Sequence, residues 1–445
     1  MNTRERRAGG LPVTVRQIAG LADLSASRYR PAGALRRLQL ARFRRLAAEA
    51  VRDVPFHRER WREAGLRPED IRSFDDLANI PPMSRSDLRG RPENEYTSAR
   101  IDPSLCRTFM TSGTSGVPLS IHYRPEDERL FNLTWIRAYR ACGLRARDHL
   151  AAFQADERRD PVTNGRWYTR IGLWRRTVFS AWASPESWLD GMARLRPNAL
   201  ATDAGTYRIL AETVEASSRP APRFRRLFNV SILIDPATRA RIETLFGGTV
   251  FDLYGSFETG CLAWECPGCG GYHINSDTAV VEILKPDGRE AGPGEAGEVV
   301  VTNLFSTAMP IIRYALGDIV VKADREPACG WPFPLLRSLE GRKDDFLRLA
   351  DGRSIPPQPF HHIFAPRIGV RRWRVEQVSS GRVRVALETE REFNEASRAL
   401  LQASVRDLLG AGVEIVWDFA ARLPDDPGSK RRAVVNVMAD GRAEE

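Results

Sequence analysis

The segment Thr111–Pro118 reads T-S-G-T-S-G-V-P and follows the run Leu105–Met110, which we expect to form a buried strand. Glycine allows tight turns and lets backbone N–H groups approach a ligand closely, and Ser and Thr hydroxyls add donors for phosphate oxygens. The segment therefore predicts a phosphate-binding loop. No G-K-[ST] follows, so it is not a Walker loop. An ordinary exposed turn is the alternative interpretation of such a cluster.

Length and composition bound the class of protein. A chain of 445 residues with 42% hydrophobic residues predicts two or three domains with large cores. No apolar run approaches the roughly 18 residues that cross a bilayer, and no signal peptide is recognised at the N-terminus. We expect a cytoplasmic protein without a membrane partner, whose six cysteines are reduced thiols or metal ligands.

The net charge of +10 raises the question of nucleic-acid binding. Only four of the 67 basic residues are lysines, and the arginines are spread along the chain among acidic residues. This pattern indicates a solvated surface rather than a dense basic patch, and we expect no nucleic-acid partner. A local basic entrance to an anionic nucleotide site is compatible with it.

Strands and helices alternate along the middle of the chain. After a tail at 1–33, apolar residues recur at helical spacing over 34–54 and predict an amphipathic helix. Apolar strands are expected at 199–202, 227–232 and 250–253, and helices at 206–216 and 236–246. This βαβ rhythm predicts a mostly parallel α/β sheet.

A helix predicted over 125–142 carries Phe131, Trp135 and Tyr139 at helical spacing. Core packing is the first interpretation of such an aromatic stripe. The alternative is that one of the rings lines an acyl pocket.

The pattern changes after residue 279. Short strands with the turn sequences K-P-D-G at 285–288 and G-P-G at 292–294 predict a small antiparallel barrel. The charged segment G-R-K-D-D at 341–345 predicts a joint to a separate unit. We therefore expect a tail at 1–33, a large N-terminal domain at 34–344 with layered α/β subdomains and the barrel, and a small mobile α+β domain at 345–445.

The segment Phe251–Gly260 reads F-D-L-Y-G-S-F-E-T-G, a predicted strand that runs into a glycine turn. At strand ends of an α/β sheet an aromatic ring can stack on a base and a carboxylate can bind magnesium. Tyr254, Gly255 and Glu258 are the candidates for these tasks. By itself such a segment is also an ordinary turn.

The order of these motifs resembles that of the adenylate-forming ligases, and within them the phenylacetate-CoA ligase branch. The resemblance runs from about Leu35 to Lys430. It rests on the hydroxyl-rich loop and on Y-G-S-F-E at 254–258, G-Y-H-I-N at 271–275, P-G-E-A-G-E-V-V-V-T at 293–302, M-P-I-I-R-Y-A-L-G-D at 309–318, G-R-K-D-D at 341–345 and the late lysine. It implies that ATP activates a carboxylic acid, aromatic or otherwise planar, to an acyl adenylate, with coenzyme A as the default acceptor.

The resemblance also implies roles for single residues. The β- and γ-phosphates would bind to Thr111, Ser112, Gly113, Thr114, Ser115 and Gly116. Tyr254 would stack near the adenine beside Gly255, and Glu258 would ligate Mg²⁺. Asp318 would accept the ribose hydroxyls, and Arg342 would reach the ribose or a phosphate. Lys430 would bring a mobile cation to the α-phosphate.

The sequence departs from the family pattern at several of these positions. Val117 stands in place of a loop lysine, Phe257 in place of the threonine before the magnesium glutamate, and Ser231-Ile232 in place of Gly-Glu beside the adenine. The segment Leu347–Ser354 matches the thiol-channel segment of thioester-forming relatives only loosely. These departures leave open an amine or other acceptor, and a degenerate protein that only binds the nucleotide.

Cys266, Cys269, His273 and Cys329 have the ligand types and local spacing of a closed tetrahedral zinc site. Members of the resembled branch carry zinc there, and a site with four protein ligands would be structural. Cys261 is a candidate to replace one of these ligands, and free buried thiols are the alternative to a metal. The cluster lacks zinc-finger spacing, which argues against a DNA-binding module. The sequence does not decide whether the chain forms a homodimer.

Overall fold

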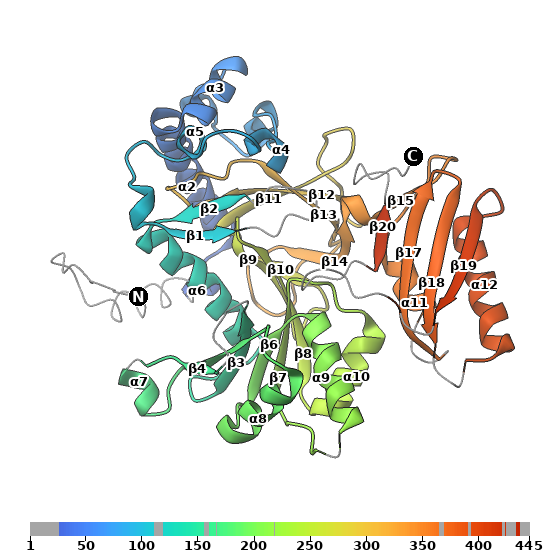
Figure 1. The fold of residues 1–445 in the computed structure, drawn as a ribbon. Coiled ribbons are helices and arrows are strands. Elements are labelled where there is room, and N and C mark those ends of the chain that lie inside the picture. Colours follow the sequence, from blue (N-terminus) through green and yellow to red (C-terminus); the bar gives the residue numbers. More distant parts are fainter. Residues whose placement is uncertain are drawn as a thin grey trace.

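The computed structural model describes residues 26–110, 119–154, 160–165, 167–217, 219–364, 369–389, 393–420, 423 and 433–436. These residues form a large N-terminal part and a smaller C-terminal part (Figure 1). The α/β class expected from the sequence is confirmed. The predicted phosphate loop Thr111–Pro118 and the predicted catalytic lysine Lys430 lie outside the described residues.

Four short or medium helices open the described chain. They are α2 (Ala32–Asp53), α3 (Pro55–Glu63), α4 (Arg85–Leu88) and α5 (Glu93–Tyr96). The predicted helix 34–54 is thus α2, and it ends just before Pro55, which disfavours helical backbone in the residue that precedes it. Its buried face, with Phe43 and Leu46, shares an apolar cluster with Val280 and Ile312 from much later in the chain. The first helices therefore cover the later, antiparallel strands.

A single mixed sheet of 12 strands dominates the large part (Figure 1). Its order is β11-β12-β13-β14-β10-β9-β8-β7-β6-β3-β5-β4. The strands are β3 (His149–Gln154), β4 (Val162–Thr163), β5 (Arg175–Ser180), β6 (Ala199–Thr202), β7 (Arg226–Val230), β8 (Thr249–Ser256), β9 (Gly260–Glu265), β10 (Tyr272–Ile274), β11 (Ala279–Leu284), β12 (Ala296–Asn303), β13 (Tyr314–Lys322) and β14 (Leu335–Arg342).

The two halves of this sheet differ in direction. Strands β5, β3, β6, β7 and β8 run parallel, which confirms the parallel α/β expectation for the middle of the chain. From β8 to β11 the pairs are antiparallel. The strands expected to form a small antiparallel barrel, β11 to β14, pair in series and continue into the parallel strands through β10, β9 and β8.

Helices cover the parallel strands. They are α6 (Pro125–Ala141), α7 (Trp167–Arg170), α8 (Pro185–Leu195), α9 (Ala204–Ala216) and α10 (Pro236–Phe246). Ser184, Asp203 and Asp235 cap the first turns of α8, α9 and α10 by accepting a backbone N–H three residues on. Among the described helices, none combines the length and the apolar character needed to cross a membrane.

The strand expected over 105–110 is β1 (Arg107–Met110), which pairs with β2 (Ser120–Tyr123) as a separate two-stranded sheet. The expectation that it is buried is wrong. Leu105 is 72% exposed and Met110 57% exposed, while Phe109 packs against the core. An isolated hairpin has one face without a covering layer, so only alternate side chains can be buried.

The C-terminal part has its own sheet and core. Its elements are β15 (Leu347–Arg348), β16 (Ser354–Ile355), α11 (Gln358–Ile363), β17 (Val370–Ser379), β18 (Arg382–Thr389), α12 (Glu395–Leu409), β19 (Glu414–Ala420) and β20 (Val434–Asn436). The four-stranded sheet has the order β19-β18-β17-β20, and α12 packs on it through Leu401, Val405 and Leu409. Figure 1 shows this part at the side of the large sheet, next to β13 and β14.

Candidate active site

One cavity of about 1860 Å³ opens between the two parts. The turn after β8, the strands β13 and β14, and the helix α6 line it from the large part, and Pro357, Trp373 and Val434 line it from the C-terminal part. Strands β3, β7 and β8 reach it with their carboxyl ends, the edge at which open α/β sheets bind ligands. The cavity is therefore the candidate active site.

The structure brings three of the predicted nucleotide residues together on its wall. The Tyr254 hydroxyl donates to Asp318 Oδ2 at 2.7 Å, and Arg342 Nε lies 3.4 Å from Asp318 Oδ1. Asp318 and Arg342 face each other in the β13–β14 pairing, so the sheet fixes their separation. Burial, followed by the charge of Asp318, raises the pKa of Tyr254 well above its ordinary value, and the hydroxyl stays a donor.

Gly255, near the end of β8, and Glu258, in the turn between β8 and β9, lie next to this group. A Cβ at Gly255 would lie 2.2 Å from the carbonyl oxygen of Gly260, so the turn has room only for glycine. The carboxylate of Glu258 lines the cavity and has no hydrogen-bond or ion-pair partner among the described residues. A carboxylate left free in this way suits a hard divalent cation such as Mg²⁺.

The segments that flank the two undescribed groups reach the same cavity. Met110 directly precedes the predicted phosphate loop Thr111–Pro118, and Ala433 follows Lys430 by three residues. Both Met110 and Ala433 line the cavity. The chain therefore enters the predicted loop, and leaves the segment of Lys430, at the candidate site.

The aromatic residues of α6 pack in the core and also line the cavity, so both interpretations of this stripe apply. Phe131, Trp135 and Tyr139 belong to or pack against apolar core clusters, and all three also line the cavity. Phe257, where the resembled family has threonine, is 40% exposed and stacks on Phe109, with ring centroids 5.2 Å apart. Phe109 stacks in turn on Phe131 at 5.1 Å. The cavity wall therefore contains a stack of three rings.

Ser231 has left-handed backbone with φ of 73°, a conformation that suits the glycine usual in the resembled family better than serine. The next carbonyl, of Ile232, accepts a hydrogen bond from Asn229 Nδ2 at 2.6 Å. The buried amide of Asn229 therefore holds this cavity-lining loop in place.

Asp252, which the sequence did not single out, is buried in β8 and lines the same cavity. Its carboxylate accepts from Asn229 at 2.7 Å and from the Tyr272 hydroxyl at 2.9 Å. Burial raises its pKa from 3.8 to about 6, against these two hydrogen bonds, and the charge of Glu265 adds to the rise. An acid in the middle of an apolar strand, F-D-L, was the available signal.

The four predicted zinc ligands lie close together. One ligand atom each from Cys266, Cys269, His273 and Cys329 lies within 4.8 Å of the others. His273 Nε2 is 3.1 Å from Cys329 Sγ, and its Nδ1 is 3.0 Å from the carbonyl oxygen of Phe333. A second partner on the other ring nitrogen is the usual way in which proteins orient a metal-binding histidine.

This donor set fits zinc. Three thiols and one imidazole are the ligands of closed tetrahedral zinc sites. Burial raises the pKa of Cys266 to about 12, and a bound dication would stabilise its thiolate. Cys261, the alternative ligand, lies outside this group, and its thiol faces the carbonyl oxygen of Ala263 at 3.4 Å.

No protein-family model matches the chain. Phenylacetate-coenzyme A ligase of Thermus thermophilus is 27% identical over 343 residues, covering 74% of this chain and 75% of that protein. The proteins of the same name from Pseudomonas putida and Escherichia coli are 27% and 25% identical, cover 73% of this chain, and are covered over 74% and 75% of their lengths.

A solved structure of 2-hydroxyisobutyryl-CoA ligase in the postadenylation state, in complex with R3-HIB-AMP, matches with a TM-score of 0.78 at 21% identity. The match covers 93% of this chain and 91% of that one. The chain has the fold of the adenylate-forming ligases. A structure of the same ligase in the thioesterification state, with 2-HIB-AMP and CoA, gives a TM-score of 0.64 at 22% identity over 93% and 91% of the two chains.

The sequence and structure comparisons together confirm the resemblance to the adenylate-forming superfamily and to its phenylacetate-CoA ligase branch. They also confirm the interpretation of the chain as an acid-activating ligase of this class. The roles of single residues are taken up next as proposals.

Proposed function

We propose that this protein uses ATP to convert a carboxylic acid to an acyl adenylate and then transfers the acyl group to coenzyme A. The observation that carries the proposal is the group of Tyr254, Asp318 and Arg342 in a cavity that both parts of the chain line. Beside this group lies the carboxylate of Glu258, which has no partner among the described residues. The curated relatives, which are named as coenzyme A ligases, support the same conclusion.

The reaction has two steps. A carboxylate oxygen of the acid attacks the α-phosphorus of ATP, a P–O bond forms, and the bond to pyrophosphate breaks. The thiol of coenzyme A then loses its proton to solvent and attacks the acyl carbon, and AMP leaves with the electrons of the broken C–O bond. Neither step needs a covalent enzyme intermediate, so the task of the protein is to orient the reactants and stabilise developing charge.

In this proposal Asp318 accepts the ribose hydroxyls, while Tyr254 lies by the adenine and Arg342 donates to the ribose or a phosphate. The hydrogen bond from Tyr254 and the ion pair with Arg342 hold the Asp318 carboxylate in one orientation, which supports that role. Glu258 binds Mg²⁺, which would neutralise charge on the phosphates. Gly255 keeps the turn close to β9.

The roles of the phosphate loop and of Lys430, which lie outside the described residues, are proposed from the family resemblance and from the positions of the residues next to them. We propose that Thr111–Gly116 binds the β- and γ-phosphates and that Lys430 stabilises charge at the α-phosphate. The lining positions of Met110 and Ala433 support this, since each lies within a few residues of the proposed group.

The acid that we propose is aromatic or otherwise planar. The cavity wall offers the rings of Trp135, Tyr139 and Phe257, and flat rings prefer stacked or edge-on aromatic partners. A branched aliphatic acid would gain less from such a wall.

We also propose that Cys266, Cys269, His273 and Cys329 bind one structural Zn²⁺. Cys266 and His273 are buried, and a set of four protein ligands favours a closed site without a position for substrate. Zinc determination on protein purified without added metal should give about one equivalent. Less than half an equivalent, with no change in stability on chelation, would contradict the proposal.

The proposed division into domains at 34–344 and 345–445 makes the second domain a lid over the site. The separate core of the C-terminal part and its share of the cavity wall support this. Limited proteolysis near residue 345, with and without ATP and the acid, tests it, and light scattering tests for the homodimer that the sequence left open.

The decisive experiment measures pyrophosphate release with ATP and Mg²⁺ across a panel of aryl and alkyl carboxylic acids, each with and without coenzyme A. We expect release that depends on one aryl acid, a further rise with coenzyme A, and a thioester detected by mass. Release that is indifferent to coenzyme A would favour an amine or other acceptor. No release with any acid would favour a protein that only binds the nucleotide.

A further inference from the structure

The turn that carries Glu258 is held at two consecutive carbonyl groups. The Tyr123 hydroxyl donates to the carbonyl oxygen of Phe257 at 2.8 Å, and Asn303 Nδ2 donates to the carbonyl oxygen of Glu258 at 2.8 Å. Asn303 Nδ2 also lies 3.3 Å from the Tyr123 hydroxyl oxygen. The two side chains come from β2 and from the end of β12, so the turn is fixed from two directions.

Both holding side chains are buried completely, with 0% exposure for Tyr123 and for Asn303. The orientation of the Asn303 amide follows from its other partners. Its oxygen accepts the backbone N–H groups of Phe305 at 3.0 Å and Ser306 at 3.2 Å, so its NH₂ group must face Glu258. Water cannot replace either donor here without a rearrangement of the core.

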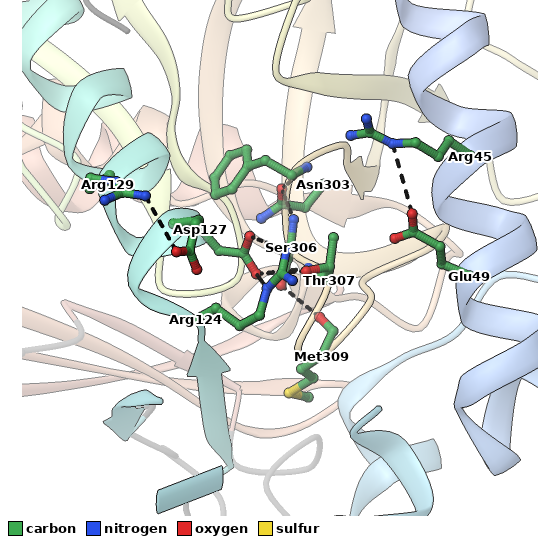
Figure 2. Close-up of polar contacts among 11 residues, drawn as sticks. Arg45, Glu49, Arg124, Asp127, Arg129, Asn303, Ser306, Thr307 and Met309 are labelled. Carbon is green, nitrogen blue, oxygen red and sulfur yellow. Dashed lines mark hydrogen bonds and ion pairs between the residues drawn. The ribbon is translucent and has the colours of Figure 1, made fainter. Parts of the chain in front are cut away.

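A second layer of contacts fixes the loop behind Asn303 (Figure 2). Ser306 Oγ donates to the carbonyl oxygen of Met309 at 2.7 Å. Thr307 donates its backbone N–H and its hydroxyl to Asp127 Oδ2, at 3.1 and 3.0 Å. Arg124 pairs with the same carboxylate at 3.3 Å. The loop after β12 is thereby tied to the first turn of α6.

We propose that Tyr123 and Asn303 are positioning residues that hold the Phe257–Glu258 turn so that the Glu258 carboxylate points at the magnesium ion. The inference rests on the proposed function, because it takes Glu258 as the magnesium ligand. A ligating carboxylate must be held within about 0.5 Å of its productive position, and outer partners of metal ligands commonly supply that restraint.

The protonation state of Tyr123 agrees with this role. Burial, and after it the nearby charge of Glu258, raises the pKa of Tyr123 well above its ordinary value. The hydroxyl therefore keeps its proton and donates to Phe257 throughout the neutral range.

Tyr123→Phe tests the proposal because it deletes one hydroxyl and keeps the ring that packs on Phe109, Phe131 and Phe305. Tyr207→Phe is the matched control. Tyr207 is equally buried, its hydroxyl lies 3.1 and 3.2 Å from the carbonyl oxygens of Leu200 and Phe228, and it does not line the cavity.

The readout is the Mg²⁺ concentration that half-saturates acid-dependent pyrophosphate release, together with the KM for the acid. We expect Tyr123→Phe to raise the half-saturating Mg²⁺ about tenfold, as is typical when an outer partner of a metal ligand is lost. The KM for the acid should change by less than about twofold. Tyr207→Phe should lower the melting temperature to a similar extent and leave both constants unchanged.

Asn303→Asp provides a second, sharper variant. Aspartate keeps the acceptor for Phe305 and Ser306 but places a carboxylate oxygen against the Glu258 carbonyl. We expect a larger rise in half-saturating Mg²⁺ than for Tyr123→Phe.

Mg²⁺-dependent binding of ATP, followed as a rise in melting temperature, is measured in parallel and separates the two possible failures. If wild type binds Mg·ATP and Tyr123→Phe titrates with Mg²⁺ like Tyr207→Phe, the positioning role is overturned and the proposed function stands. If wild type releases no pyrophosphate with any acid, the proposed function fails, and a rightward shift of the Mg²⁺-dependent binding curve in Tyr123→Phe still supports the positioning role. Absence of Mg²⁺-dependent binding in wild type overturns both.

Discussion

The cavity group and the cysteine cluster are two polar sites with opposite designs. In the cavity, the side chain of Arg342 is 56% exposed and the carboxylate of Glu258 has no partner among the described residues. In the cluster, His273 is 0% exposed and both of its ring nitrogens face a partner. Unsatisfied, accessible groups are suited to ligands that enter and leave, and closed sets of four donors are suited to a permanent ion.

Strands of one sheet carry residues of both sites. Tyr254 lies near the end of β8, and His273 lies in β10, two strands away in the sheet. Between them Tyr272 donates to Asp252, whose backbone N–H donates to Glu265, the residue before Cys266. These contacts connect the strands of the two sites, and the zinc that we propose for the cluster would stabilise them without taking part in the reaction.

The largest effect is expected from Glu258→Gln, which removes the negative charge of the free carboxylate and nearly keeps its shape. We expect acid-dependent pyrophosphate release to fall about 100- to 1,000-fold, with no change in melting temperature. Glu298→Gln is the control, because Glu298 lines the same cavity but pairs with Lys343 at 2.8 Å. Equal pyrophosphate release by the two variants would show that Glu258 has no role in the reaction.

Lys430→Ala tests whether the cavity also depends on a cation from outside the described residues. We expect a fall of about 100-fold in pyrophosphate release at saturating ATP, because charge at the α-phosphate is no longer stabilised. Lys285→Ala, which removes a lysine paired with Glu295 away from the cavity, should leave the rate unchanged. Unchanged release in Lys430→Ala would exclude the lysine from the adenylation step.

Cys329→Ser should have the opposite effect to that expected for Glu258→Gln: it should lower the stability of the protein and change the rate little. We expect bound zinc to fall below half an equivalent and the free energy of unfolding to fall by about 3 kcal/mol. The rate per folded molecule should stay within about twofold at a temperature well below the transition. Cys106→Ser, outside the cluster, is the control. A large fall in the rate of the folded Cys329 variant would contradict a purely structural site.

Gly255→Ala tests how closely the cavity turn packs on β9. The new Cβ would meet the Gly260 carbonyl oxygen at 2.2 Å, so β8 or β9 must shift, at a cost of about 1 to 3 kcal/mol. We expect lower stability together with weaker ATP binding. Gly381→Ala, at a position with open space around it, should change neither. ATP affinity equal to wild type would show that the turn tolerates the shift.

The smallest effect concerns Asp252, between the two sites. Its pKa is raised from 3.8 to about 6, so its contribution to stability is fully present below about pH 4 and is lost as the pH rises through 6. Wild type should lose about 1 kcal/mol of stability relative to Asp252→Asn between pH 5 and pH 7. Unfolding by denaturant at the two pH values measures the difference. If wild type and Asp252→Asn differ in stability by the same amount at both pH values, the contacts with Asn229, Tyr272 and Arg239 already offset the effect of burial on the Asp252 pKa.

Local pattern was enough to predict many elements closely. The alternation of apolar strands with helical segments predicted α10 at 236–246 and β6 at 199–202, with the bounds that the structure shows. The same logic failed for the run 105–110, because burial depends on what covers a strand. The pattern predicted the antiparallel strands after residue 279 but not their continuity with the parallel strands, because strand composition does not say which partner an edge will find.

The sequence by itself determined the chemistry on offer: a hydroxyl-rich loop, a glycine turn with an acid, a late lysine, and four soft or nitrogen donors at metal-site spacing. Only the tertiary structure decided how these groups meet. Tyr254 and Asp318, 64 residues apart, share a hydrogen bond, and Asn303 bonds to the Glu258 turn from 45 residues away. Neither Tyr123 nor Asn303 stands out in the chain, because a buried donor has a task only where the fold supplies a carbonyl group that water cannot reach.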